Sequence, residues 1–251
     1  MEYGAFTCRG SQRKSNEDYY YIPGPEGSGC EFIIIADGMG GHNAGDLASR
    51  TAVELISAYF CENVKDHKDK KHLVESLYQA ITEANKKIYD MSKTEERLLG
   101  MGTTLTMAVF AHGLVYIAHI GDSRCYIIKG NEVRQITRDH SLVQELLDNG
   151  SITADEMSVH PNRNIITRAL GTEETLKIDL FEETISEGDI VILCSDGLSN
   201  YVKLDEELSN ISGDLPVCEL VKELGAKALA AGSTDDITIV AARYTGCEKE
   251  R

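Results

Sequence analysis

Carboxylates stand at the ends of several apolar runs in this sequence, where a negative charge needs a partner. Asp37 directly follows the run Phe32–Ala36, and Asp196 follows Ile190–Ser195. Three more acidic residues stand near the ends of such runs or in short turns: Asp18, Asp122 and Asp235. A single Asp at the end of a strand is usually a turn residue. Several in one domain indicate a shared positive partner, because a buried carboxylate without one costs free energy.

The residue types favour a hard metal cation as that partner. Mg²⁺ and Mn²⁺ prefer oxygen ligands, and the ends of strands hold such ligands rigidly. A glycine follows both Asp37 and Asp196. Glycine lets the backbone, including the carbonyl of Gly38, approach a metal closely. The sequence therefore predicts a metal site built from strand-end carboxylates.

Apolar periodicity predicts the elements that position these carboxylates. Helical spacing of apolar residues occurs over 47–60, 73–91 and 215–231. Predicted strands span 3–9, 31–36, 103–111, 114–120, 123–129, 132–137, 176–183, 189–195 and 237–243. The connections between 103 and 137 are short, which favours antiparallel hairpins because a parallel crossover needs about a dozen residues.

Strands in blocks and helices in pairs indicate an α+β fold rather than an alternating α/β fold. Two antiparallel sheets packed face to face, with helices outside each sheet, would bury every apolar stripe. The segment 139–171 follows neither periodicity and is predicted to be mostly irregular with short helices.

Composition limits the possible functions and locations. The chain has 251 residues and a net charge of -16, which would repel nucleic acid phosphates. Its seven cysteines are odd in number and form no CxxC pair, so reduced thiols are expected rather than disulfides or a zinc site. No apolar run is long enough to span a membrane, and no apolar leader is apparent. A cytoplasmic protein that does not bind membranes is expected.

The order of five motifs gives a resemblance to a known family. RxxNED, DGMGGHxxGD, GDSR, SDGL and TDDIT occur in the order typical of the metal-dependent protein phosphatases of type 2C, the PPM family. The chain is most similar to the bacterial branch, which opposes serine/threonine kinases. The resemblance covers nearly the whole chain as one domain, 1–251, and 139–171 resembles that branch's flap. It implies a central antiparallel β-sandwich flanked by helix pairs on both sides (α-β-β-α), with a binuclear Mn²⁺ or Mg²⁺ site at one end.

The resemblance also implies which residues bind metal. Asp37 would bridge the two ions, with the Gly38 carbonyl on one of them. Asp196 and Asp235 would bind the other ion, and Asp18 would lie beside the pair, acting directly or through water. Asp122 would hold a third ion more weakly.

Substrate binding and proton transfer are also assigned from the resemblance. Arg13 would bind the substrate phosphate, and a water activated by both metals would attack phosphorus, so no side-chain nucleophile is needed. Animal members carry a His two residues after the bridging Asp, where this chain has Met39. Here His42 either protonates the leaving serine oxygen through water or only forms hydrogen bonds within its turn. His160 is another candidate acid and a candidate substrate contact.

These features predict hydrolysis of phosphoserine and phosphothreonine in proteins, by a monomer that opposes a serine/threonine kinase. Two alternatives stay open. A catalytically silent phosphoprotein-binding module of the same fold would be expected to lose Asp37, Asp196 or Asp235, all of which are present. A structural Ca²⁺ site would not need Arg13. One departure from the family pattern is Asp236, which stands where the family usually has Asn and adds a charge.

Overall fold

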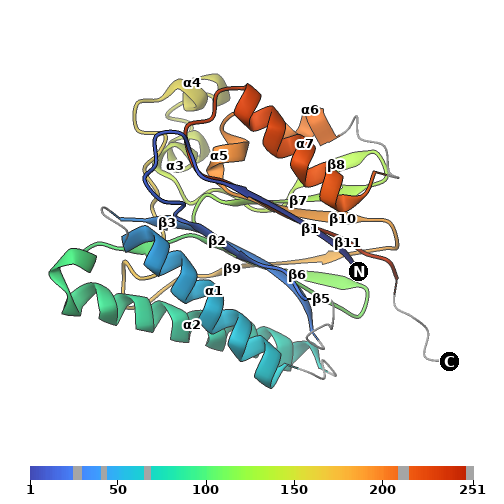
Figure 1. The fold of residues 1–251 in the computed structure, drawn as a ribbon, viewed down its shortest axis with the longest axis horizontal. Coiled ribbons are helices and arrows are strands. Elements are labelled where there is room, and N and C mark those ends of the chain that lie inside the picture. The colour runs from blue at the N-terminus through green and yellow to red at the C-terminus, as the bar shows by residue number, and fades with distance from the viewer. Residues whose placement is uncertain (25–29, 41–43, 65–68, 209–214, 247–251) are drawn as a thin grey trace.

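Two antiparallel β-sheets lie face to face between helices (Figure 1). The computed structural model describes residues 1–24, 30–40, 44–64, 69–208 and 215–246. The first sheet has the order β1 (Glu2–Cys8), β11 (Ile237–Arg243), β10 (Ile190–Cys194), β7 (Arg124–Lys129) and β8 (Glu132–Gln135). The second has the order β2 (Asp18–Tyr21), β3 (Glu31–Met39), β5 (Leu105–Ala111), β6 (Leu114–Ile120) and β9 (Asp179–Thr184), with β4 (Gly102–Thr103) paired to β3.

Strand β3 shows why a continuous apolar run is needed at the centre of this fold. Successive side chains of a strand point to opposite faces of its sheet. Ile33 and Ile35 pack in the core between the sheets, with Val191 and Leu193 of β10. Ile34, on the other face of β3, packs beneath the helices. Both faces of the strand are therefore buried.

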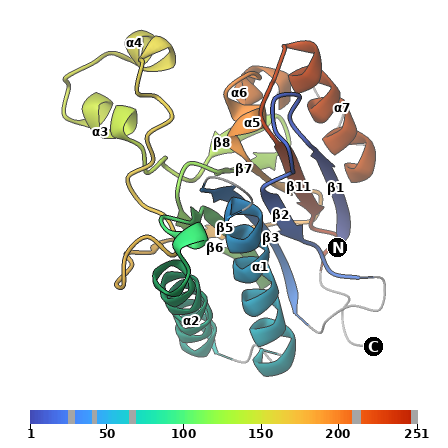
Figure 2. The same cartoon turned by 60° about the vertical axis from the view of Figure 1, so that its left-hand side comes forward.

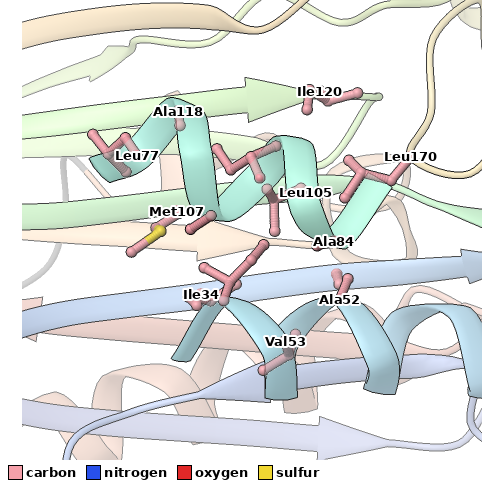
Figure 3. Packing of buried hydrophobic residues seen from close by; sticks show 14 of the residues in the cluster. Ile34, Ala52, Val53, Leu77, Ala84, Leu105, Met107, Ala118, Ile120 and Leu170 are labelled. Carbon is pink, nitrogen blue, oxygen red and sulfur yellow. The ribbon is translucent and has the colours of Figure 1, made fainter. Parts of the chain in front are cut away.

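Helices α1 (Ala44–Asn63) and α2 (Lys70–Thr94) cover the outer face of the second sheet. Figure 3 shows Ala52 of α1 and Leu77 of α2 directed toward the sheet, where Met107 and Ala118 are buried. The side chain of Asp69 accepts a hydrogen bond from the Lys71 N–H and caps the start of α2.

The outer face of the first sheet is covered by α7 (Val217–Ala230), together with the short helices α5 (Asp196–Ser199) and α6 (Leu204–Leu208). Helix α7 lies close to β1. A Cβ atom at Gly225 would come within 2.4 Å of the Phe6 ring, so any larger residue there would displace that ring. The predicted α+β sandwich with helices on both sides is confirmed.

The structure differs from the prediction at two strands near the acidic residues. Strand β2 was not predicted, because its sequence DYYY has no apolar alternation and its tyrosines are only half-buried. Strand β3 continues past its apolar run, because Gly38 and Met39 pair with Thr103 and Gly102 of β4. Asp37 therefore lies within a paired strand rather than in a turn.

Segment 139–171 projects from the sandwich beside one of its ends (Figure 2). It contains α3 (Leu142–Asp148) and α4 (Ala154–Val159). An isolated bridge between Ser141 and Ile166 closes its base, and a second bridge joins Leu170 to Thr103 of β4 in the body. A short 3₁₀ helix, η1 (Glu96–Leu98), follows α2. Within the described ranges, no helix has the length and apolar character required to cross a membrane.

Candidate metal centre

The centre begins with two carboxylates on neighbouring strands. In the antiparallel register of β2 and β3, Asp18 is the direct partner of Asp37. Ile35 points into the core between the sheets, so side-chain alternation places Asp37 on the same inner face. Like charges directly opposite each other destabilise a sheet. This pair therefore needs a positive partner or a proton.

The first sheet brings further carboxylates to the same end of the sandwich. Ser195 directly follows β10, and its hydroxyl donates to Asp18 Oδ2 over 2.9 Å. Ser195 Oγ in turn accepts from the Thr238 N–H at 2.9 Å. The next residue, Asp196, begins α5, and its carboxyl lies against that of Asp37. The ends of both sheets therefore meet at these acidic residues.

The acidic residues shift one another's protonation. Burial, followed by the charges of Asp18, Asp196, Asp122 and Asp235, raises the pKa of Asp37 well above its usual value. Burial raises the pKa of Asp18 to about 7 and that of Asp196 to about 6, with a neighbouring carboxylate adding to each shift. These shifts mean that the negative charges are held close together and are partly shielded from water.

The donor set fits hard divalent cations. Asp18 Oδ1 and Asp122 Oδ1 are buried and accept no hydrogen bond from the described residues. A buried carboxylate oxygen without a donor is suited to a cation ligand, and an all-oxygen set suits Mn²⁺ or Mg²⁺. Within the described ranges, no group of three or more His, Cys, Asp or Glu side chains is arranged so that it could hold a metal ion by itself. The fit therefore depends on the shared negative charge and on these two oxygens.

Arg13 lies at the edge of the acidic residues and binds one of them. Its Nε donates to Asp235 Oδ1 at 2.8 Å and its Nη2 to Asp235 Oδ2 at 2.9 Å. Its Nη1 donates to Glu17 Oε2 at 3.1 Å. The hydrogen bonds and charge of Asp235 raise the pKa of Arg13 further, against the smaller opposing effect of burial. Arg13 therefore occupies one acceptor position on each oxygen of Asp235, and a metal bound by Asp235 would share the carboxylate with Arg13 or displace it.

A cavity of about 500 Å³ connects this centre to the 139–171 segment. Its lining includes Asp122, Asp196 and Asp235 of the acidic centre, together with Met157 and Arg163 of the segment.

Arg124 also lines this cavity and donates to both oxygens of Asp139, at 2.9 Å and 2.8 Å. Sequence reasoning did not single out Arg124 or Arg163. Arg124 is the last residue of the GDSR motif, so this motif is the feature of the sequence that could have identified it.

The remaining predicted residues have different outcomes. His42 lies outside the described residues. His160 is half-buried, its Nδ1 accepts from the Asn162 N–H at 3.1 Å, and it is not among the described residues that line the cavity. At Gly38 a Cβ atom would come within 2.1 Å of the Gly45 carbonyl oxygen. The backbone of Gly38 is therefore packed closely against the start of α1.

Comparisons with known proteins identify the family of this chain. A family model described as Protein phosphatase 2C matches residues 9–230. A curated relative from Listeria monocytogenes serotype 4b, named serine/threonine phosphatase stp, is 39% identical over 93% of this chain and 92% of its own length. The crystal structure of the Mycobacterium tuberculosis serine/threonine phosphatase PstP/Ppp is 36% identical, with a TM-score of 0.86 over 97% of this chain and 98% of that one. A structure of the PstP catalytic domain in complex with two manganese ions is 35% identical, with a TM-score of 0.83 over 96% of each chain. This chain belongs to the protein phosphatase 2C family.

Proposed function

We propose that this protein hydrolyses phosphoserine and phosphothreonine in other proteins at a binuclear Mn²⁺ or Mg²⁺ site. The observation that supports this most directly is the convergence of carboxylates from both sheets, two of them with buried oxygens that accept no hydrogen bond from the described residues. The names of the relatives support the substrate class, and the two manganese ions of the PstP structure support the metal.

The residues divide into those that would hold metal and those that would hold substrate. Asp37 would bind both ions, because it lies between Asp18 of its own sheet and Asp196 of the other. Asp235 and the Gly38 carbonyl would complete the pair, and Asp122 would bind a third ion more weakly. Bound divalent ions would neutralise the carboxylates and activate a water for attack on phosphorus.

Arg13 would bind the phosphate of the substrate. Its guanidinium already makes two parallel hydrogen bonds to a carboxylate, and a phosphate offers the same pair of acceptors. Its side chain is 41% exposed, so an anion arriving from solvent can reach it. Arg13 and Asp235 now bind each other. A phosphate bound by Arg13 would take the place of Asp235, and a metal bound by Asp235 would take the place of Arg13.

The 139–171 segment would act as a flap over the substrate. It supplies Met157 and Arg163 to the lining of the cavity that the acidic residues also line, so a peptide bound at the centre would contact both the segment and the acidic residues. We further propose that the chain acts as a single domain and a monomer, and that it opposes a serine/threonine kinase.

The deciding experiment is hydrolysis of a phosphothreonine peptide with and without added metal. Protein stripped with chelator should be inactive and should regain activity with Mn²⁺ or Mg²⁺. Asp196→Asn is the matched variant: it should remain folded but stay nearly inactive at every metal concentration. Full activity in protein shown to hold no metal would exclude the two-metal site. Binding of the phosphopeptide without turnover at any metal concentration would instead favour the silent module.

A further inference from the structure

Asp236 is a buried carboxylate whose two oxygens bind opposite ends of one loop. Its side chain is 3% exposed. Oδ1 accepts from the Gly10 N–H at 2.8 Å, and Oδ2 accepts from the Glu17 N–H at 2.8 Å. The loop between these two amides, residues 10–17, contains Arg13. Each oxygen of Asp236 is therefore committed to a different end of the loop.

The loop packs directly on the backbone beside Asp235. A Cβ atom at Gly10 would come within 2.4 Å of the Thr234 carbonyl oxygen and the Asp235 carbonyl carbon, so no other residue fits there without a shift. Within the loop, the Arg13 N–H donates to the Gly10 carbonyl at 3.1 Å, which forms a turn. These contacts place the Arg13 guanidinium on the Asp235 carboxylate.

The Asp236 carboxylate is linked to the acidic centre through one residue, Glu17. Its partner amide belongs to Glu17, and the Glu17 carbonyl accepts from the Gly38 N–H at 3.0 Å and from Ser49 Oγ at 2.6 Å. Gly38 directly follows Asp37 in β3. A change at Asp236 can therefore alter the loop on one side and the strand on the other, and an experiment must separate these effects.

A carboxylate suits this position better than the amide that the family usually has. Both of its oxygens accept hydrogen bonds, whereas an Asn side chain has one accepting oxygen and one donating NH₂ group. With Asn here, the NH₂ group would face one of the two backbone N–H donors. One end of the loop would lose its acceptor, and the buried N–H would be left unpaired.

We propose that Asp236 is a positioning residue for phosphate binding, which fixes Arg13 by holding both ends of the 10–17 loop. This rests on the proposed function, in which Arg13 binds the substrate phosphate. In this chain a carboxylate stands where the family usually has an amide, and it accepts from two backbone N–H groups at once.

The first test compares Asp236→Asn with the wild type. The variant should raise the KM for a phosphothreonine peptide and the dissociation constant for inorganic phosphate by about tenfold, the effect of losing one hydrogen bond to a charged group. Its kcat and its number of tightly bound Mn²⁺ ions should change by less than about twofold, since the metal ligands are retained. Phosphate binding is measured by calorimetry on Mn²⁺-loaded protein, so this result does not depend on turnover.

A double-variant cycle shows whether Asp236 acts through Arg13. In the Arg13→Ala background, Asp236→Asn should cause little further loss of phosphate affinity, because the side chain that it positions is gone. An equal further loss in that background would overturn the proposal. A fall in Mn²⁺ stoichiometry without a change in phosphate affinity would also overturn it, because Asp236 would then act on the metal ligands.

Amide hydrogen exchange of the 9–17 peptide gives a readout that is independent of catalysis. Exchange should be faster in Asp236→Asn than in the wild type, and faster still in Asp236→Ser, which has one short hydroxyl in place of two oxygens. Asp236→Ser also serves where Asp236→Asn does not fold. Unchanged exchange in both variants would contradict the proposal. If the wild type does not hydrolyse the phosphopeptide, the proposed function fails, while phosphate calorimetry and hydrogen exchange still decide the role of Asp236.

Asp189→Asn is the matched control. Asp189 is also a buried carboxylate, 8% exposed, and it accepts from a backbone amide, the Ser186 N–H, at 2.9 Å. It lies at the opposite end of β10 from Asp196. This substitution should leave KM, phosphate affinity and exchange of the 9–17 peptide unchanged.

Discussion

At the scale of single residues, Asp37 and Asp122 are expected to differ in how they hold metal. Asp37 is paired with Asp18 across two strands and lies against Asp196. Asp122 lies in the turn between β6 and β7, where the charges of Asp196 and Asp139 add to the effect of burial and raise its pKa. A bridging ligand affects two ions and the attacking water, whereas a peripheral ligand affects one ion.

Asp37→Asn should therefore lower the rate by several powers of ten, where each power of ten corresponds to about 1.4 kcal/mol of activation free energy. The variant should also lose the tight binding of both ions. Asp122→Ala should keep two tightly bound ions, and its activity should recover at high metal concentration. Metal titration of activity and calorimetric counting of Mn²⁺ check both variants. Loss of tight binding in Asp122→Ala, with retention in Asp37→Asn, would reverse the two assignments.

Arg13→Lys and Arg13→Ala separate charge from geometry. Lys keeps the positive charge but cannot form the two parallel bonds that Arg13 makes to Asp235. Both variants should raise the KM for a phosphopeptide, with Arg13→Lys intermediate, and both should fold and bind Mn²⁺. Equal KM values in all three proteins would show that the guanidinium does not bind the phosphate.

Sequence alone identified the acidic residues but not their contacts. Asp37 and Asp196 could be found because each follows an apolar strand. The pairing of Arg13 with Asp235 joins residues that are 222 positions apart, and no local pattern predicts it. The role of Asp236 was likewise hidden, because the amides of Gly10 and Glu17 become its neighbours only when β11 lies beside β1.

At the scale of elements, His140 connects the 139–171 segment to the turn that holds Asp122. Its backbone N–H donates to the Gly121 carbonyl at 2.7 Å, and its Nδ1 accepts from the Gly121 N–H at 3.1 Å. Nδ1 is thus an acceptor, and Nε2 lies 3.2 Å from Asp179 Oδ2 and 3.1 Å from Arg168 Nη1. Arg168, at the other end of the segment, donates to the same carboxylate at 3.0 Å.

His140→Ala should therefore loosen the base of the segment and the turn beside Asp122. We expect a higher Mn²⁺ concentration for half-maximal activity, together with faster hydrogen exchange in the peptide that contains Gly121. The two tightly bound ions should remain. His72→Ala, on the exposed surface of α2, is the control and should match the wild type. A normal metal requirement in His140→Ala would show that this contact is dispensable.

The segment also shows which local signals the sequence offered. Helix α4 begins with a capping box in which Thr153 and Glu156 bond each other's backbone amides, and the Thr-x-x-Glu spacing is visible in the sequence. At α3 the cap is one-sided: the Ser141 hydroxyl accepts from the Gln144 N–H. Strand β2 offered no such signal, because it exists through pairing with β3 and not through its own composition.

At the scale of the whole molecule, the two sheets are joined at the acidic end by side chains as well as by the apolar core. The Ser195 hydroxyl connects Asp18 of the second sheet to the Thr238 backbone of the first. Two antiparallel sheets could be predicted from hairpin spacing and apolar stripes. Which sheet ends would meet could not, because that depends on the register of β2 with β3 and of β10 with β11.

The buried side of this end also contains a histidine whose titration bears on the stability of the entire fold. His119 on β6 is 0% exposed, and its Nδ1 lies 3.0 Å from Thr106 Oγ1. Its Nε2 lies 3.1 Å from the Arg138 carbonyl, which can only accept, so the neutral ring with its proton on Nε2 satisfies both contacts. Burial, and next the neighbouring His140, lower the pKa of His119 to about 3, against weaker opposing effects that include Asp179.

The lowered pKa of His119 determines the direction in which acid changes the free energy of unfolding. Unfolded histidine has a pKa of about 6.5, so between about pH 6.5 and 3 the unfolded chain binds a proton that the folded His119 does not. The free energy of unfolding should therefore fall as the pH falls below 6.5, by up to about 1.4 kcal/mol per pH unit from this residue. His119→Gln removes the titrating group and should reduce that slope, even where the substitution lowers stability at pH 7. Urea unfolding of both proteins between pH 7.5 and 4.5 measures the difference, in which the other titrating groups largely cancel. Parallel pH profiles for the two proteins would mean that His119 accepts a proton in the folded state as easily as in the unfolded chain.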